Sequence, residues 1–497
     1  MKKNLILHIA PHLSGGLERV LFSTLRYSNK ENSPFLHEII ILDKKNLTNH
    51  TKKKFLKYNK FIHIGKEYDF IKKKICEADI VQVEYWNHPQ IYEFLTNFRF
   101  PLSRLVLCSH INGFLRPQII TKNAVDFSDI FLSTTKATRK HPLFISKKNI
   151  DRKKKLKFVN YPVDFKRFGK IKPKSHKGFN ISYIGTLDYS KLHKDFLEMS
   201  SAINLPKTNI IVCGGGNDKS KIEKDAKKYT KTKFRFKGFV ENLKNILSIT
   251  DILGYPLNKN HFGTGEQVII EAMYSKIPIV AFANRTEKEI IQNKKTGILV
   301  KNKDDYVRAI KCLYSDSKKR KKIGLNAHRH ILTNLSPSVS FNNLNKVYKK
   351  LMYSKKKLRK FRTKILKKND NKNFGSKLFI ESLGTKGGEF LKSYKNSGKK
   401  INKKINENIK NAEIELKALT KGSLFQYLYF YPNDPYLNFW AGLMSLNKNN
   451  IFKKNHKPIN KSSYDYFRKA LKLDKKNKEF QYYLKNISNL NTVLTHS

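Results

Sequence analysis

The sequence is poor in cysteine and has no long apolar run. Its four cysteines, Cys76, Cys108, Cys213 and Cys312, are widely spaced and form no C-x-x-C pair. This spacing argues against a zinc site and a disulfide framework, and it favours a reducing, cytoplasmic location. No apolar stretch approaches the roughly 18 residues of a membrane span, so any membrane contact is expected to be peripheral. The first apolar run, NLILHIA, is short and ends in a turn, which predicts a strand and not a signal peptide.

Acidic residues are also scarce. The chain has 101 lysines and arginines against 39 aspartates and glutamates, a net charge of +62. Such a balance often indicates nucleic acid or an anionic membrane as a partner. Here lysine is spread over the whole chain together with many asparagines and isoleucines, which is typical of a compositional bias of the source. Basic and aromatic residues are not interleaved in any one module, so we expect no nucleic acid partner. A weak attraction to an anionic membrane face is still expected.

Two series of short apolar runs alternate with helix-length segments, which is the pattern of parallel sheets with crossover helices. The runs are NLILHIA, HEIIILD, FIHIG, ADIVQV, RLVLCSH and DIFLST in the first series, and FNISYIG, NIIVCGGG, KFRFKGF, DILGYPL, IPIVAF and GILV in the second. The segment NYPVDFKRF between them reads as a hinge. We predict an α/β fold with a first domain over residues 1–165 and a second over 166–353, including a return helix. The two domains would face each other across a cleft at the carboxyl ends of their strands.

The composition changes after residue 353. Residues 354–411 are very basic and punctuated by glycine, which predicts a flexible or loosely helical linker. Residues 412–497 are predicted to be an all-α module. The segment SYDYFRKALKL resembles the second helix of a tetratricopeptide repeat, and DPYLNFWAGLMSL is a candidate first helix with Gly442 at a close helix contact. An unrelated helical bundle is the alternative. We expect the cleft to be complete by about residue 353, and the module to place the protein on its acceptor substrate, a protein partner or an anionic membrane face.

The stretch HFGTGEQVIIEAM, residues 261–273, joins a strand to a helix through a turn with two glycines. It has neither the GK[ST] ending of a P-loop nor a strand-linked GxGxxG. The free N–H groups and the positive dipole end of such a helix favour an anion. Glu271 lies one turn further in, where a carboxylate accepts hydrogen bonds from ribose hydroxyls but repels an adjacent phosphate. A nucleotide with its phosphates at the turn and its ribose at Glu271 satisfies both conditions.

Several motifs together resemble the family-4 retaining glycosyltransferases, which have two Rossmann-like domains facing across a cleft (GT-B). The strongest is EAMYSKIPIVAF followed by TEKEII and KTGILV. The resemblance covers roughly residues 1–352, and it also includes LSGGLERV, ADIVQVEYWNHP, NYPVDFKRF, YIGTLDYSKLHKDF and FKGFVENLKNILSITDILGYPL. It implies transfer of a sugar from a nucleotide diphosphate sugar, with retention, to a hydroxyl of a glycan, glycolipid or protein acceptor in cell-surface polysaccharide biosynthesis. It also implies no metal or other cofactor, and no Asp-x-Asp stands at a strand end.

The resemblance assigns roles to residues of both domains. His110, at a strand end, would lie near the transferred sugar, and Lys191 would pair with the diphosphate. These two and Glu266 are the catalytic candidates. Trp86 and His88 are expected to serve packing. The donor-binding candidates are Gly15, Gly16, Gly185, Thr186, Lys191, Val240, Gly263, Thr264, Gly265, Gln267, Val268 and Glu271.

One departure from the family pattern concerns the sugar contact. The family has two glutamates eight positions apart; the second matches Glu271 and the first falls on Gly263. Either Glu266 makes the missing contact from a displaced position, or loop N–H groups alone hold the sugar. Two other functions stay open: a GT-B epimerase or hydrolase of nucleotide sugars, and a scaffold protein whose donor site has decayed.

Overall fold

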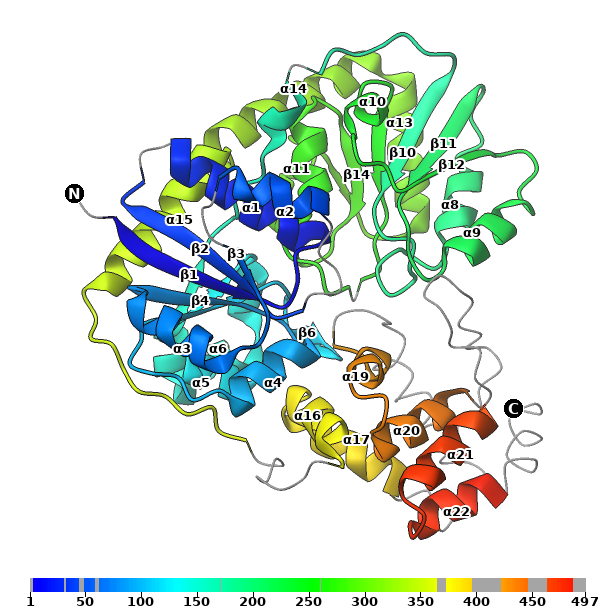
Figure 1. Ribbon diagram of the computed structural model, residues 1–497. Coiled ribbons are helices and arrows are strands. Elements are labelled where there is room, and N and C mark those ends of the chain that lie inside the picture. The colour runs from blue at the N-terminus through cyan, green and yellow to red at the C-terminus, as the bar shows by residue number, and fades with distance from the viewer. Residues whose placement is uncertain are drawn as a thin grey trace.

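The computed structural model describes residues 3–30, 33–43, 49–58, 62–169, 171–259, 261–363, 372–395, 422–445 and 463–485. They form two parallel sheets with packed helices and a group of C-terminal helices beside the first sheet (Figure 1). Within this part of the chain, no helix is both long enough and apolar enough to cross a membrane.

The first sheet has seven strands in the order β3-β2-β1-β4-β5-β8-β9, and all neighbouring pairs are parallel. The central strands are buried along their whole length, as expected for a parallel sheet covered on both faces. The strands are β1 (Asn4–Ala10), β2 (Phe35–Ile41), β3 (Ile62–Ile64), β4 (Ile80–Tyr85), β5 (Leu105–Ser109), β8 (Ile130–Ser133) and β9 (Leu156–Phe158). The sequence runs predicted all of these except the short edge strand β9. A two-stranded hairpin, β6 (Phe114–Leu115) with β7 (Gln118–Ile119), was also not predicted, because strands this short leave no readable period.

Helices of the first domain follow its strands. They are α1 (Gly15–Lys30), α2 (Asn49–Leu56), α3 (Tyr68–Glu77), α4 (Pro89–Asn97), α5 (Lys122–Phe127), α6 (Pro142–Ile145) and α7 (Ile150–Lys155), with the 3-10 turns η1 (Lys136–Lys140) and η2 (Lys147–Asn149). The start of α4 illustrates the local cause: Pro89 occupies the first helical position, and the His88 side chain caps it by accepting a hydrogen bond from the N–H of Gln90.

The second sheet has six parallel strands in the order β12-β11-β10-β13-β14-β15. They are β10 (Phe179–Ile184), β11 (Thr208–Cys213), β12 (Lys233–Gly238), β13 (Ile252–Tyr255), β14 (Ile279–Phe282) and β15 (Ile298–Val300), and each confirms a predicted run. The helices are η3 (Phe165–Phe168), α8 (Phe196–Ala202), α9 (Lys219–Ala226), α10 (Lys244–Leu247), α11 (Gln267–Tyr274), α12 (Glu287–Ile290), α13 (Lys303–Ser315) and α14 (Ser317–Asn334). Helix α15 (Pro337–Met352) then crosses back to the first domain, where Leu344, Tyr348 and Leu351 enter the core beside the sheet.

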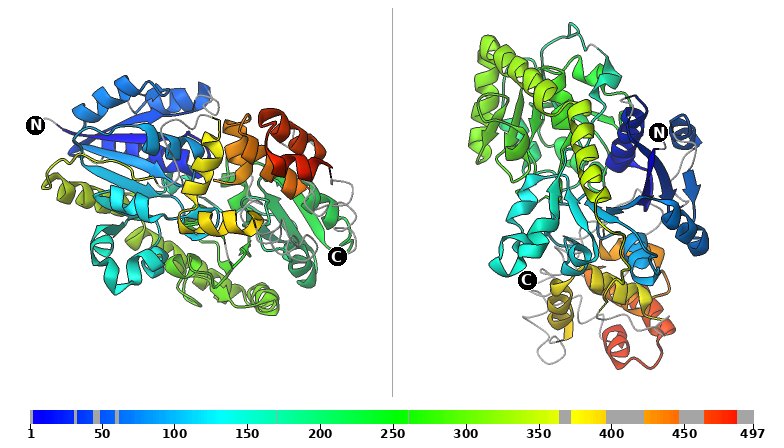
Figure 2. Two further views of the ribbon diagram at one scale, coloured as in Figure 1. Left: turned by 90° about the horizontal axis from the view of Figure 1, so that it is seen from below. Right: turned by 90° about the vertical axis from the view of Figure 1, so that its left-hand side faces the viewer.

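The C-terminal helices form a group beside the first domain, and α16 and α19 contact helix α4 of that domain (Figures 1 and 2). The group comprises α16 (Phe374–Ser382), α17 (Thr385–Lys395), α19 (Leu424–Phe430), α20 (Pro435–Ser445), α21 (Ser463–Leu473) and α22 (Lys478–Lys485). Helix α16 contacts α4, and its Leu378, Phe379 and Ile380 are at most 2% exposed. The prediction of a linker over residues 354–411 is therefore wrong for this segment. The very basic surroundings concealed a short apolar helix that the first domain covers.

The predicted repeat-like pair corresponds to α20 and α21, which pack against each other. Gly442 is needed at their contact, because a Cβ atom there would lie 2.6 Å from Cε1 of Phe467. The tetratricopeptide character of the pair stays a prediction. Residues 364–371, 396–421, 446–462 and 486–497 of the predicted linker and module lie outside the described residues.

Candidate active site

A cleft of about 2450 Å³ lies between the two sheets. Residues that follow β1, β4, β5 and β8 line one wall, and residues that follow β10, β11, β12 and β13 line the other. This is the edge at which parallel sheets place their ligands. Every predicted site residue lines this cleft: His110, Lys191, Glu266, Gly15, Gly16, Gly185, Thr186, Val240, Gly263, Thr264, Gly265, Gln267, Val268 and Glu271.

Glu266 and Lys191 form an ion pair at the start of helix α11. Glu266 is 6% exposed, and its Oε2 accepts hydrogen bonds from the hydroxyl of Tyr255 at 2.6 Å and from Nζ of Lys191 at 2.9 Å. Burial opposes ionisation of Glu266, but the Lys191 ammonium, the neighbouring His261 ring and these hydrogen bonds outweigh it and lower its pKa to about 2. The two catalytic candidates of the second domain therefore carry opposite charges at neutral pH.

The carboxylate of Glu266 lies over Gly263. A Cβ atom at Gly263 would stand 1.9 Å from Oε1 of Glu266 and 2.9 Å from Nδ1 of His261. Position 263 must therefore be glycine if Glu266 adopts this rotamer. Whether Glu266 or the loop N–H groups replace the family's first glutamate stays a prediction.

His261 anchors the glycine turn to the second domain. Its Nδ1 accepts a hydrogen bond from the N–H of Gly263 at 3.1 Å, so Nε2 carries the proton and donates to Oε2 of Glu287 at 3.2 Å. Glu287 is fully buried and also accepts the hydroxyl of Thr286 at 2.9 Å. No role was predicted for Glu287, although it lies in the motif TEKEII that carried part of the resemblance.

The same turn is anchored to the first domain by Asn112. Its amide donates to the carbonyls of His261 and Gly263 at 2.8 and 3.1 Å. This residue was missed because a lone asparagine in a loop carries no sequence signal. The turn that faces the donor is thus held from both walls of the cleft.

Helix α11 also meets helix α1 across the cleft. Glu271 is 1% exposed and lies 3.9 Å from Nη1 of Arg19, and Gln267 donates to the carbonyl of Gly16 at 3.4 Å. Arg19 was not predicted as a site residue. Its charge offsets that of Glu271, which lowers the repulsion between this carboxylate and a nearby phosphate.

Glycines open the backbone on both walls. Gly15 has φ +59°, and a Cβ atom on Gly15 or Gly16 would meet no atom within 4 Å, so the start of α1 is accessible to a ligand. On the opposite wall, a Cβ atom on Gly214 would lie 1.8 Å from the carbonyl oxygen of Gly185. The turns after β10 and β11 therefore pack backbone against backbone and keep side chains out of this wall.

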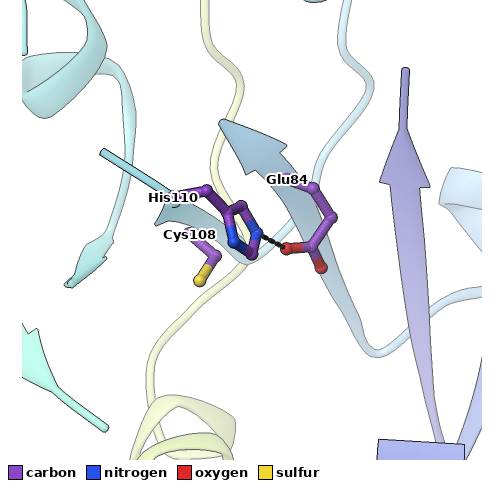
Figure 3. Close-up of side chains that lie close together, drawn as sticks. All are labelled: Glu84, Cys108 and His110. Carbon is purple, nitrogen blue, oxygen red and sulfur yellow. Dashed lines mark hydrogen bonds and ion pairs between the residues drawn. The ribbon is translucent and has the colours of Figure 1, made fainter. Parts of the chain in front are cut away.

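His110 is held by a buried carboxylate on the neighbouring strand (Figure 3). Its Nε2 lies 2.7 Å from Oε2 of Glu84, which is fully buried. Burial opposes ionisation of Glu84, but hydrogen bonds from His110 and His8 outweigh it and lower its pKa from the ordinary 4.5 to about 2. An ionised carboxylate only accepts hydrogen bonds, so Nε2 of His110 carries the proton. The ring stacks on Tyr161 with a centroid distance of 5.8 Å.

The other oxygen of Glu84 continues the network into the interior. Oε1 accepts from Nδ1 of His8 at 2.9 Å and from the amide of Gln82 at 2.8 Å. Nε2 of His8 then lies 2.9 Å from Nδ1 of His37. Burial and the neighbouring His8 lower the pKa of His37 well below its ordinary value, so this ring is neutral. Glu84, backed by His8 and His37, therefore fixes the orientation of His110.

Glu84, Cys108 and His110 also bring possible metal ligands together, with their ligand atoms within 4.8 Å of one another. Glu84 and His110 are already hydrogen-bonded to each other, and Sγ of Cys108 lies 2.8 Å from the hydroxyl of Tyr161. Burial raises the pKa of the Cys108 thiol well above its ordinary value, so it is protonated at neutral pH. Since each of the three side chains already has a hydrogen-bond partner, we describe the cluster as a hydrogen-bonded support for His110.

The cleft extends beyond the two predicted domains. Trp86 and His88, which were assigned to packing, are at most 3% exposed but line it, and so do Phe425, Tyr429 and Phe430 of the C-terminal segment. The prediction that the cleft is complete by residue 353 is therefore wrong. Trp86 and His88 of the loop after β4 line the cleft, and helices α16 and α19 contact the same loop through Asn87.

The second domain is similar to a known protein family. Residues 164–330 match the family of group 1 glycosyl transferases. The matched region contains the Lys191–Glu266 pair, Glu271 and the glycine turn, but not His110 or Glu84. No curated protein matches the sequence.

Solved structures share the fold of both domains. HepE (Alr3699) of Anabaena in complex with UDP and glucose is 14% identical, with a TM-score of 0.55 over 70% of this chain and 100% of its own. A glycosyltransferase from Rickettsia africae ESF-5 is 16% identical, with a TM-score of 0.55 over 71% and 100%. A mutant of TarM from S. aureus, in complex with Fondaparinux, alpha-GlcNAc-glycerol and UDP, is 13% identical, with a TM-score of 0.56 over 71% and 100%. The chain thus has the GT-B fold.

His110 and Glu84 lie outside residues 164–330, which match the group 1 family, and their hydrogen bond can be tested by mutation. Glu84→Gln is expected to lower the rate of sugar transfer about tenfold, because a neutral amide no longer fixes the proton of His110. It should also destabilise the fold at pH 7, since a partner of a buried network is lost.

This stabilisation should depend on pH. Because the folded pKa of Glu84 is about 2 against an ordinary 4.5, its ionised form stabilises the folded state above pH 4.5. That contribution is lost as the pH falls toward 2. The gap in unfolding free energy between wild type and variant should therefore shrink between pH 5 and pH 2, measured by denaturant unfolding. A gap independent of pH in this range would contradict an ionised Glu84.

Proposed function

We propose that this protein transfers a sugar from a nucleotide diphosphate sugar to an acceptor hydroxyl, with retention at the anomeric carbon and without a metal ion. The observation that carries the proposal is the Lys191–Glu266 pair at the start of α11, with Glu271 one turn further in and His110 lining the same cleft from the opposite domain. The acceptor would be a glycan, glycolipid or protein glycan of the cell surface, reached from the cytoplasmic side.

The donor would lie along helix α11. The N–H groups at the start of the helix and the ammonium of Lys191 would bind the diphosphate, and Glu271 would accept hydrogen bonds from the ribose hydroxyls. Two of the similar structures hold UDP together with sugars, which makes UDP-sugars the first donors to test. Phe239 is 76% exposed at the end of β12 and lines the cleft beside Val240, a position suited to cover the base.

Transfer breaks the bond between the anomeric carbon and the diphosphate oxygen through an oxocarbenium-like state, and the acceptor oxygen forms the new bond to the same carbon. The proton of the acceptor hydroxyl would pass to the departing diphosphate oxygen. Negative charge grows on the leaving diphosphate, where Lys191 and the helix N–H groups stabilise it. Glu266 would contact the sugar hydroxyls while holding Lys191 in place. His110, whose Nε2–H is held by Glu84, would offer its other ring nitrogen to a hydroxyl of the sugar or the acceptor.

The proposal is tested by donor binding followed by product analysis. UDP-, GDP- and ADP-sugars are screened by thermal unfolding of the full chain, because a ligand at about 100 times its Kd stabilises the fold by about 2.7 kcal/mol. The donor that binds is then incubated with and without acceptor extract, and the products are separated. Transfer to acceptor supports the proposal. Free sugar alone or an epimerised donor would identify the hydrolase or epimerase alternative, and binding without turnover would identify a scaffold protein.

Activity is expected to persist in EDTA, because the groups assigned to charge stabilisation are amides and a lysine. The measurement is the transfer rate before and after chelation, with and without added Mg²⁺ or Mn²⁺. Loss of activity that either ion restores would show that a metal, and not Lys191, carries the leaving diphosphate.

A further inference from the structure

We infer that helix α19 builds an acceptor subsite into the cleft, and that this subsite takes a saccharide carrying negative charge. The inference rests on the proposed function, since it names the class of acceptor that the transferase would use. It starts from the loop after β4, Trp86 to His88, which lies between the candidate His110 and the C-terminal helices.

Asn87 ties the C-terminal helices to this loop. It is fully buried, and its amide donates to the carbonyl of Ser382 in α16 at 2.7 Å and to that of Ile119 in the β6–β7 hairpin at 3.1 Å. Its own carbonyl accepts the hydroxyl of Tyr427 in α19 at 3.2 Å. Gly422 fits against the same residue, because a Cβ atom there would lie 2.5 Å from Cβ of Asn87. Helix α19 is therefore fixed to the rim of the cleft and is not a tethered attachment.

A continuous row of rings leads from His110 to α19. Trp86 meets His110 at 5.9 Å and His88 at 5.6 Å between ring centroids, and His88 meets Phe430 at 5.3 Å. Next in the row, Tyr429 contacts Phe430 at 5.3 Å and is 59% exposed. His110, Trp86, His88, Phe430 and Tyr429 all line the cleft. Tyr429 therefore offers an exposed aromatic face at the end of a row of largely buried rings, and such a face suits the apolar side of a sugar ring. An acceptor glycan bound on Tyr429 would extend along the cleft toward His110.

The charge along this path has one sign. Of the described residues that line the cleft, those from the first domain and the C-terminal helices include no aspartate or glutamate. They do include Arg116 in the β6–β7 hairpin and Lys469 in α21, and Figure 1 shows β6 next to α19. Arg116 also lies 3.7 Å from Glu389, which is itself 54% exposed. The opposite wall contributes acidic residues such as Glu266, Glu271 and Asp188. The acceptor end is thus complementary to phosphate or carboxylate groups on a glycan.

The test compares full-chain variants of α19 with a matched control. Tyr429→Ala and Phe430→Ala remove the stacking surface. Tyr464→Ala removes a tyrosine of α21 that is 47% exposed and lies away from the cleft lining. For charge, Lys469→Gln is compared with Lys472→Gln on the same helix. The probe is the glycan extract of the source cells, separated by anion exchange into an anionic and a neutral fraction. The donor is the nucleotide sugar that stabilises the wild type, labelled in its sugar.

We expect label to enter the anionic fraction, with the transfer rate about tenfold lower for Tyr429→Ala and Phe430→Ala and unchanged for Tyr464→Ala. Lys469→Gln should weaken the salt dependence of transfer, and Lys472→Gln should not. Donor-induced stabilisation and slow donor hydrolysis without acceptor should stay at wild-type values in all variants.

Four outcomes would contradict these expectations. Wild-type transfer by both α19 variants, or label in the neutral fraction alone, would overturn the subsite. An equal loss of hydrolysis would show that α19 supports the donor site instead. A wild type that binds no nucleotide sugar would refute the proposed function itself.

Discussion

Replacing Lys191 with methionine is expected to lower kcat for sugar transfer by about 10²–10³-fold while the nucleotide still binds. Lys191 is the described cation that contacts Glu266 at the start of α11, and it lines the cleft where the leaving diphosphate would lie. Methionine keeps the length of the side chain but cannot stabilise charge that grows as the bond to the anomeric carbon breaks. The measurement is kcat at saturating donor, with nucleotide Kd from titration calorimetry. Lys194→Met is the control, because Lys194 lines the same cleft and is exposed.

The interpretation of this variant depends on stability, because Lys191→Met leaves Glu266 buried beside a neutral side chain. Breaking a buried pair in this way costs about 3–5 kcal/mol. The double variant Lys191→Met with Glu266→Gln removes both charges and should recover much of that stability without recovering the rate. If the double variant regained both, the loss in the single variant would reflect folding and not catalysis. A wild-type kcat in the single variant would place the stabilising charge elsewhere.

Replacing Glu271 with alanine is expected to raise the Kd of UDP by about 10–100-fold, since a hydrogen bond to a charged group contributes about 1.5–3 kcal/mol. The reason is its place one turn inside α11, almost fully buried and beside Arg19. Binding of UDP is compared with binding of 2′,3′-dideoxy-UDP, which lacks the ribose hydroxyls. Wild type should discriminate between the two nucleotides, and Glu271→Ala should not.

Glu266→Gln serves as the contrasting variant. It should leave the Kd of UDP nearly unchanged and lower turnover, because Glu266 lies at the start of the helix near the transferred sugar. Equal effects of the two variants on Kd would remove the distinction between ribose and sugar contacts. Normal UDP binding and turnover in Glu271→Ala would show that the ribose lies elsewhere.

Three buried carboxylates lie in or directly behind the walls of this cleft, each beside a basic side chain. Glu84 holds His110, Glu266 holds Lys191, and Glu287 holds His261. A buried carboxylate stays ionised only where such partners offset its desolvation, as the low pKa values of Glu84 and Glu266 show. The pairs therefore set the orientation and protonation of the groups that face the ligand before any ligand binds, which is the preorganisation that charge stabilisation requires.

The sequence by itself determined the two sheets and the donor turn. These are local features. A short apolar run indicates a buried parallel strand, and two glycines between a strand and a helix indicate the turn before α11. The places of Glu266 and Glu271 were also predictable, because the first lies at the start of the helix and the second about one turn inside it. All residues predicted to bind the donor line the cleft, because they lie in turns that follow predicted strands.

Only the tertiary structure decided which side chains meet. The order of strands in a sheet is set by burial and crossover, so the contact of His110 with Glu84, 26 residues apart, has no pattern in the sequence. The same holds for Asn87 and Ser382, 295 residues apart, whose hydrogen bond brings the C-terminal helices to the cleft. There the basic composition predicted a linker, because the apolar face of α16 is short and becomes recognisable only against the surface of α4 that covers it. The cleft wall of the second domain thus follows from local sequence, and the wall formed by the first domain and the C-terminal helices depends on packing between segments far apart in the chain.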